Sequence, residues 1–147
     1  MFINRHAKQT VGKLSHMFGA VLVTGARQAG KTTLLKEMSG SAFLYVTLDD
    51  PIMLATAKET GNTFFKDNPP PVFVDEIQYA PNLFPFIKMI IDAKKAKGMF
   101  FLSGSQQFKM MKNVRESLAG RLGILNLPVL SLRELFDVYS RGAHRAS

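Results

Sequence analysis

The chain has 147 residues, of which 46% are hydrophobic and 20% charged, with a net charge of +8 and no cysteine. This composition is typical of one globular domain with a sizeable core, and it excludes a disordered chain, a disulfide framework and a cysteine metal site. No apolar run approaches the roughly 18 residues that span a bilayer, so we expect no membrane partner and, given the missing cysteine, a cytoplasmic protein.

The first 19 residues carry Ala7, Val11, Leu14 and Phe18 at helical spacing. This pattern predicts a helix that packs beside the first strand. The segment lacks the apolar core of a secretory signal, but it is basic and free of acids, which is also compatible with a transit peptide.

Residues 20–24 predict a strand and residues 31–38 a helix that ends at Ser39-Gly40. Between them the sequence fits G-x-x-x-x-G-K-[ST], the phosphate-binding P-loop or Walker A pattern. Its glycines let backbone N–H groups approach phosphate oxygens, and the following helix adds its positive dipole end. Lys31 would reach the β- and γ-phosphates, and the Thr32 hydroxyl would ligate Mg²⁺. We predict that the nucleotide is bound by Gly25, Ala26, Arg27, Gln28, Ala29, Gly30, Lys31, Thr32 and Thr33.

The middle of the chain continues the alternation of strand and helix. Residues 43–48 are strand-like and close on Asp49-Asp50-Pro51. Residues 52–66 predict a helix with a break at Gly61-Asn62, followed by three prolines at 69–71.

Residues 72–76, Val-Phe-Val-Asp-Glu, form an apolar run that ends in two carboxylates. Wholly apolar strands are buried on both faces of a parallel sheet. This is the Walker B arrangement, in which Asp75 holds the Mg²⁺ shell. Glu76 is then the candidate general base that polarises the attacking water.

A strong helix is predicted over residues 82–97, with Phe84, Ile87 and Ile91 on its buried face. Residues 99–102 predict the next buried strand. Ser103 or Ser105, after this strand, is placed to sense the γ-phosphate or the water, and an ordinary Ser-Gly-Ser turn is the alternative. We then expect a helix at 107–119, a strand at 122–127 and a last helix that starts at the capping box 131–134.

This alternation predicts an α/β fold of the three-layer P-loop NTPase type, with a five-stranded, mostly parallel sheet and helices on both faces. Ligands of such sheets bind at the carboxyl ends of the strands. The polar clusters that follow the predicted strands all fall there, namely 25–33, 49–50, 75–76 and 103–106.

The charge is concentrated in the last part of the chain. Residues 1–87 carry eight Lys/Arg and seven Asp/Glu, whereas residues 88–147 carry eleven and four. One interpretation is a surface for nucleic acid or another acidic partner. The other is a solvated lysine face, which the absence of an aromatic-interleaved basic cluster favours.

The chain resembles the AAA-type P-loop ATPase domain of a large group of prokaryotic proteins, in which this domain precedes a C-terminal domain. The matching motifs, in order, are GARQAGKTT (25–33), LDDP (48–51), DEIQYAP (75–81), LSGSQQF (102–108) and SLAGR (117–121). The resemblance implies ATP rather than GTP, and an added strand between the Walker A and Walker B strands. It also implies a sensor role for Ser103 or Ser105 and a γ-phosphate contact for Arg121. The family more often has threonine where Ser103 stands, which keeps the hydroxyl.

From these observations we expect a helical segment at 1–19, an ATPase domain at 20–140 and a tail at 141–147, with the second domain absent. The predicted function is Mg²⁺-dependent ATP hydrolysis that acts as a conformational switch. Its catalytic residues would be Glu76, Ser103 and Arg121, and its metal ligands Thr32 and Asp75. A separate effector domain or a second copy of the chain is the expected partner. The alternatives are a nucleotide- or DNA-binding module without useful turnover, and a small P-loop kinase.

Overall fold

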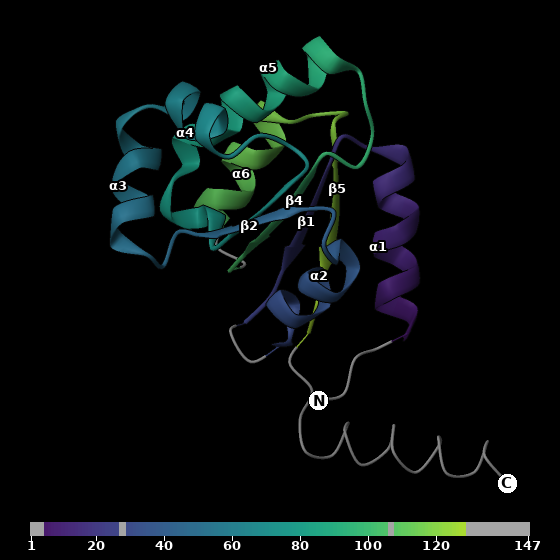
Figure 1. Cartoon of the computed structure of the whole chain (residues 1–147). Coiled ribbons are helices and arrows are strands. Elements are labelled where there is room, and N and C mark those ends of the chain that lie inside the picture. Colours follow the sequence, from purple (N-terminus) through teal and green to yellow (C-terminus); the bar gives the residue numbers. More distant parts are fainter. Residues whose placement is uncertain (1–4, 27–28, 106–107, 129–147) are drawn as a thin grey trace, which may run out of the picture.

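The computed structural model describes residues 5–26, 29–105 and 108–128 (Figure 1). Its helices are α1 (Arg5–Met17), α2 (Lys31–Ser39), α3 (Pro51–Glu59), α4 (Gly61–Asp67), α5 (Phe84–Lys94) and α6 (Phe108–Ser117). Two short 3-10 helices, η2 (Ile77–Tyr79) and η3 (Pro81–Leu83), precede α5. The strands are β1 (Ala20–Thr24), β2 (Leu44–Thr47), β3 (Val72–Asp75), β4 (Phe100–Gly104) and β5 (Leu122–Asn126).

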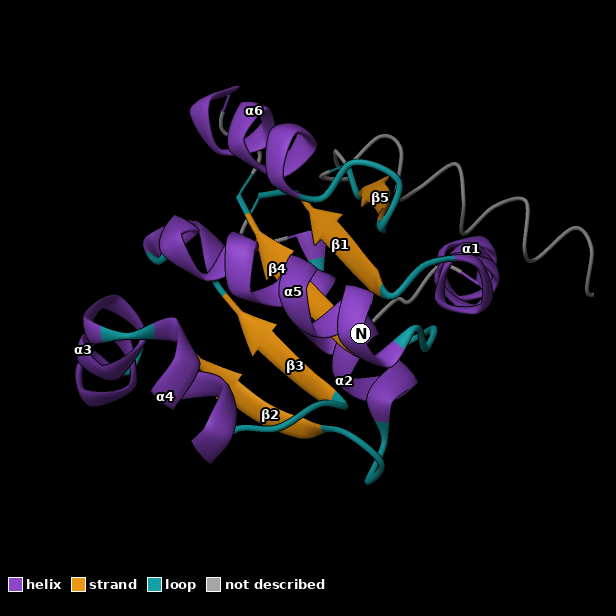
Figure 2. Cartoon of the chain, turned by 90° about the horizontal axis from the view of Figure 1, so that it is seen from above, coloured by secondary structure: helices purple, strands orange, loops and turns teal. Residues whose placement is uncertain are grey.

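The strands form one parallel sheet in the order β2-β3-β4-β1-β5, as Figure 2 shows. The strand β4 therefore lies between β1, which leads into the P-loop, and β3, which ends at Asp75. This is the added strand that the family resemblance implies. Because all strands run the same way, the residues that follow β1, β3 and β4 meet at one edge of the sheet.

Successive residues of each strand face opposite layers, which separates the core into two clusters. On one face, strand residues such as Leu22, Val74 and Leu102 pack with α3, α4, α5 and α6. On the other face, Val23, Phe73 and Phe101 pack with α1 and α2, and Figure 1 shows α1 and α3 on opposite sides of the sheet. The three-layer α/β fold is thus confirmed.

The helix α1 packs on β5, β1 and α2 rather than on the first strand alone. Gly123 of β5 makes this close approach possible, because a Cβ there would lie 2.9 Å from Leu14 and from Phe18. Val11 is fully buried, as its helical spacing predicts.

Most predicted elements match the structure to within two residues, and in three of them the difference has a cause in the backbone conformation. The helix expected over 52–66 is divided into α3 and α4 at Thr60, whose extended backbone (φ −156°) interrupts it one residue before the predicted break. The helix expected to reach residue 97 ends at Lys94, because Lys95 adopts a left-handed conformation with φ 54°. The strand expected over 72–76 ends at Asp75, because Glu76 is also left-handed, with φ 61°. The last predicted helix lies outside the described residues.

Within residues 5–26, 29–105 and 108–128, no helix combines the length and the apolar character that crossing a membrane requires.

Candidate nucleotide-binding site

The P-loop joins the end of β1 to the start of α2. A Cβ on Gly25 would lie 2.5 Å from the carbonyl oxygen of Leu127, so only glycine fits between β1 and the segment after β5. Gly30 caps α2 with φ 84°, a conformation that glycine adopts without strain. The glycines therefore serve the turn itself, as the motif predicts.

Lys31, the first residue of α2, is directed into the molecule and is only 2% exposed. Its Nζ forms an ion pair with Oε1 of Glu76 at 3.2 Å. The other carboxylate oxygen of Glu76, Oε2, accepts a hydrogen bond from Nε2 of Gln78 at 2.7 Å. The predicted phosphate-binding lysine and the predicted general base are thus direct partners.

Asp75 is the centre of a second set of contacts at the end of β3. Oδ1 accepts a hydrogen bond from Thr32 at 3.1 Å and another from the hydroxyl of Ser103. Oδ2 accepts from the hydroxyl of Tyr45 at 2.8 Å and lies 3.3 Å from the Thr32 hydroxyl. The carboxylate is therefore held by hydroxyl groups from α2, β2 and β4.

Ser103 also links the two acidic residues. Its Oγ accepts a hydrogen bond from the backbone N–H of Glu76 at 3.3 Å while it donates to Asp75. Gln78 makes a similar link, since its Oε1 accepts from the backbone N–H of Ser105 at 3.3 Å. The ends of β3 and β4 are tied together by side chains.

The donor set suits Mg²⁺, which prefers hard oxygen ligands and usually binds through one or two protein groups plus phosphate oxygens. Among the described residues, no cluster of three or more His, Cys, Asp or Glu residues could hold a metal ion alone. Within the described ranges, the buried charged side chains are those of Lys31, Asp75 and Glu76. Lys31 is paired with Glu76, so a cation beside Asp75 would balance the second carboxylate.

Among the buried side-chain nitrogen and oxygen atoms of the described residues, one has no hydrogen-bond partner, the Oγ of Ser105. Buried hydroxyl groups are normally hydrogen-bonded, so an exception requires an explanation. Ser105 directly follows β4, at the edge of the sheet where the P-loop lies. A phosphate oxygen or a water bound there would supply the missing partner.

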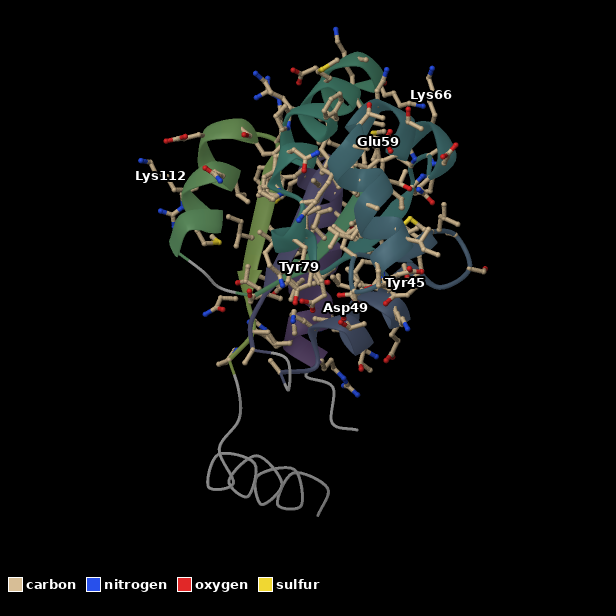
Figure 3. All side chains as sticks on the ribbon, turned by 90° about the vertical axis from the view of Figure 1, so that its left-hand side faces the viewer. Tyr45, Asp49, Glu59, Lys66, Tyr79 and Lys112 are labelled. Carbon is tan, nitrogen blue, oxygen red and sulfur yellow. The ribbon has the colours of Figure 1, made fainter. Side chains whose placement is uncertain are left out.

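Tyr45 lies at the solvent boundary of this cluster and is 38% exposed. Figure 3 shows Tyr45, Asp49 and Tyr79 toward one end of the molecule, away from Lys66 and Lys112. Burial of the hydroxyl, followed by its hydrogen bond to Asp75, raises the pKa of Tyr45 to about 12. The phenol therefore remains a hydrogen-bond donor at neutral pH.

The structure brings together most of the residues that the sequence predicts. Lys31, Thr32, Asp75, Glu76 and Ser103 form one connected group. The other predicted P-loop residues within the described part of the chain, Gly25, Ala26, Ala29, Gly30 and Thr33, are in the loop or the first turn of α2. Arg27 and Gln28 lie outside the described residues.

Arg121 is the exception, because the structure does not bring it to this group. Its backbone carbonyl accepts a hydrogen bond from Ala20, at the opposite end of β1 from the P-loop. Four residue steps, from Ala20 to Thr24, separate these ends, a distance of about 13 Å. Its guanidinium pairs with Asp92 of α5 at 2.6 Å and 3.1 Å. The structure therefore does not support a γ-phosphate contact by Arg121 of the same chain, and a contact from another copy stays a prediction.

Three further residues of this edge had no role predicted from the sequence. Gln78 belongs to the quoted motif at 75–81, but nothing in the pattern indicates what it contacts. Asn126 ends β5 and accepts from the Thr24 hydroxyl at 3.2 Å, and its place at a strand end was the available signal. Tyr45 lies two residues before the end of β2, so no strand-end rule selects it.

The acidic pair that follows β2 has at least one structural role. Oδ1 of Asp50 accepts hydrogen bonds from the backbone N–H groups of Ile52 at 2.9 Å and Met53 at 3.5 Å. These bonds cap the amino terminus of α3, so the carboxylate of Asp50 serves that helix.

Known proteins that are similar to this chain indicate its family. The family model for an AAA domain matches residues 18–136, most of the chain. Two uncharacterized proteins, Mb2031c of Mycobacterium bovis and Rv2008c of Mycobacterium tuberculosis, are each 32% identical to this chain over 151 residues. These alignments cover 96% of this chain but 31% of each relative, so the chain spans about a third of their length.

Among solved structures, the RuvB Holliday junction branch migration motor of Thermotoga maritima aligns with 99% of this chain and 52% of its own length. Its TM-score is 0.48 at 18% sequence identity, too low to bear on function. The family match stands without it and agrees with the motifs and with the contacts among Lys31, Thr32, Asp75 and Glu76. The chain therefore belongs to the AAA domain family, as an ATP-binding module of the AAA-type ATPases.

Proposed function

We propose that the module hydrolyses ATP in a Mg²⁺-dependent reaction and uses the reaction as a conformational switch. The observation that carries the proposal is the meeting of Lys31, Thr32, Asp75 and Glu76 at the carboxyl edge of the sheet. Each has the chemistry of one part of a P-loop ATPase site. Glu76 also favours hydrolysis over the small-kinase alternative, because it supplies an acid that can activate water.

In this proposal each residue has a separate role, which follows from the charge and chemistry of its side chain. Lys31 binds the β- and γ-phosphates, and the oxygens of Thr32 and Asp75 hold Mg²⁺, which would neutralise the charge of the phosphates. Glu76 orients the attacking water and accepts its proton. Ser103 holds the two acids in register through its two hydrogen bonds.

The contacts between β3 and β4 supply a physical basis for the switch. Gln78 joins Glu76 to the backbone of Ser105, and the Ser105 hydroxyl has an open hydrogen-bonding position. Gain or loss of a γ-phosphate at this position would change the hydrogen bonding of Ser105, the residue that follows β4. We assign the ATPase domain to residues 20–140. In this proposal, another domain, a separate protein or a second copy of the chain responds to the change.

A test must separate nucleotide binding from folding, because Lys31→Ala leaves the buried Glu76 carboxylate without its cation. Breaking a buried ion pair in this way costs about 3–5 kcal/mol of stability. The double variant Lys31→Ala/Glu76→Gln removes both charges and is the appropriate variant. Its matched control is Glu76→Gln alone, which keeps Lys31 and leaves an amide oxygen beside the ammonium group; because this variant also breaks the ion pair, its stability is measured beside that of the double variant.

We expect the control to bind a fluorescent ATP analogue and the double variant, equally folded by circular dichroism, to lose that binding. The wild-type chain should release phosphate from ATP only when Mg²⁺ is present, with and without DNA. Equal nucleotide affinity of the two variants would contradict the phosphate-binding role. Salt-dependent retention on DNA without turnover would favour the binding-module alternative.

A further inference from the structure

Tyr45 belongs to β2, an outermost strand of the sheet, and its side chain reaches the candidate site. Thr47 is paired with Asp75 and Tyr45 with Phe73, so Tyr45 and Asp75 point to the same face of the sheet. Its hydroxyl donates to Oδ2 of Asp75 at 2.8 Å. The contact thus crosses from one strand to the end of the next.

The ring that carries this hydroxyl is held on two sides. The ring of Phe73 meets it edge-on, with centroids 5.2 Å apart at 60°. The ammonium of Lys36, one turn beyond Thr32 in α2, lies 4.3 Å from the centroid of the Tyr45 ring. A ring fixed by a strand neighbour and by α2 holds its hydroxyl at a defined point.

The two oxygens of Asp75 receive different donors. Ser103 of β4 donates to Oδ1, Tyr45 of β2 donates to Oδ2, and Thr32 lies near both. Donors on opposite sides fix the plane of the carboxylate. An ionised carboxylate accepts about four hydrogen bonds, so capacity for a metal ion or its bound water remains.

We propose that Tyr45 is a positioning residue for the metal ion of the nucleotide site, acting by holding Oδ2 of Asp75. This inference rests on the proposed function and adds a residue to it. Groups that hydrogen-bond to metal ligands orient them, and their removal typically lowers metal affinity 10- to 100-fold. Tyr45 itself touches neither the nucleotide nor the metal in this role.

The test is Tyr45→Phe, which removes the hydroxyl but keeps the ring between Phe73 and Lys36. The control is Tyr79→Phe, since Tyr79 is similarly exposed, at 41%, and its hydroxyl has no partner among the described residues. Binding of a fluorescent ATP analogue is titrated in EDTA and at increasing Mg²⁺. Binding of Mn²⁺ in the presence of the analogue is followed by electron paramagnetic resonance, a readout independent of turnover.

We expect Tyr45→Phe to keep the affinity measured in EDTA and to need roughly tenfold more Mg²⁺ or Mn²⁺ for the metal-dependent gain. Tyr79→Phe should behave as the wild type. A wild-type metal dependence in Tyr45→Phe overturns the inference and leaves the proposed function standing. Equal loss of binding with and without metal also overturns it, because Tyr45 would then support the fold in general. A wild-type chain that binds no nucleotide overturns the proposed function itself.

Discussion

Asp75 and Glu76 are adjacent in sequence, but their side chains have different partners. Asp75 is surrounded by the hydroxyl groups of Thr32, Tyr45 and Ser103, whereas Glu76 faces Lys31 and Gln78. The left-handed backbone of Glu76, with φ 61°, separates the two directions. The difference in surroundings predicts two different phenotypes.

Glu76→Gln should retain Mg²⁺-dependent ATP binding and hydrolyse ATP roughly 100-fold more slowly, the scale of losing a general base. Asp75→Asn should instead weaken the gain in ATP affinity that Mg²⁺ provides. Both effects are measured by steady-state phosphate release and by analogue binding at several Mg²⁺ concentrations. Identical behaviour of the two variants would falsify the assigned division between metal binding and water activation.

Gln78 gives a third prediction at the residue scale. Because it joins Glu76 to the N–H of Ser105, Gln78→Ala should misorient the carboxylate and lower turnover at saturating ATP by about tenfold to a hundredfold. ATP affinity should change little. The control is Asn82→Ala, which removes a side chain that donates to the carbonyl of Ala57, a residue of α3. A loss of ATP affinity equal to the loss of turnover would contradict this role.

At this scale the sequence predicts the residues whose positions follow from a strand end. Lys31 and Thr32 lie in the helix that follows β1, Asp75 ends β3 and is followed by Glu76, and Ser103 is the last residue but one of β4. Tyr45 could not be found in this way, because its contact depends on the register between β2 and β3 and on the length of its side chain. The pairing of Lys31 with Glu76 likewise depends on the directions of the two side chains, which the spacing of residues in the sequence does not determine.

At the scale of elements, α5 shows how a helical pattern of apolar residues contributes to the stability of the fold. Phe84, Ile87 and Ile91 are buried against the sheet, as their spacing predicts, whereas Lys88 and Lys94 are exposed. Phe84→Ala should lower the free energy of unfolding by about 3–5 kcal/mol, measured by urea denaturation. Met89→Ala is the matched control in the same helix, because Met89 is 63% exposed, and should change it by less than about 0.5 kcal/mol. Equal effects would contradict the burial of this face.

The types and order of the elements are predictable from the sequence, but their ends are less so. The end of α2 at Gly40 is visible in the sequence, since glycine there adopts φ 54°. The end of α5 is not, because Lys95 is left-handed despite its side chain, and nothing local distinguishes it from Lys94. A left-handed conformation at an ordinary, exposed residue such as Lys95 leaves no signal in the residue type.

At the scale of the whole molecule, Arg121 is the residue whose prediction requires a second copy. In one chain its guanidinium is paired with Asp92, at the end of the sheet opposite the P-loop. If it completes the site of a neighbouring copy, Arg121→Ala should lower turnover by ~10³–10⁵ with little effect on ATP affinity. Wild-type turnover per chain should then rise with protein concentration.

Two comparisons decide between this role and a local one. Mixing Arg121→Ala with the inactive Glu76→Gln chain should restore some activity, because the latter supplies the arginine. If Arg121 only joins β5 to α5, then Arg121→Ala and Asp92→Asn should reduce stability alike and leave turnover at saturating ATP unchanged. That result would show that Arg121 makes only a structural contact.

In the proposed function, the Glu76 carboxylate competes with ATP for the ammonium group of Lys31, with which it forms an ion pair. The carboxylate of Glu76 binds the ammonium group at the place that a phosphate oxygen would take, so ATP would have to displace it. The observed affinity for ATP would then be lowered by the free energy of that exchange. Glu76→Gln should therefore bind ATP more tightly than the wild type, by up to about tenfold or 1.4 kcal/mol, in isothermal titration. In the proposed mechanism, the same displacement would release Glu76 only when phosphate is bound, so the ion pair would keep the base inactive in the empty site. An unchanged or weaker affinity would show that the exchange does not oppose binding.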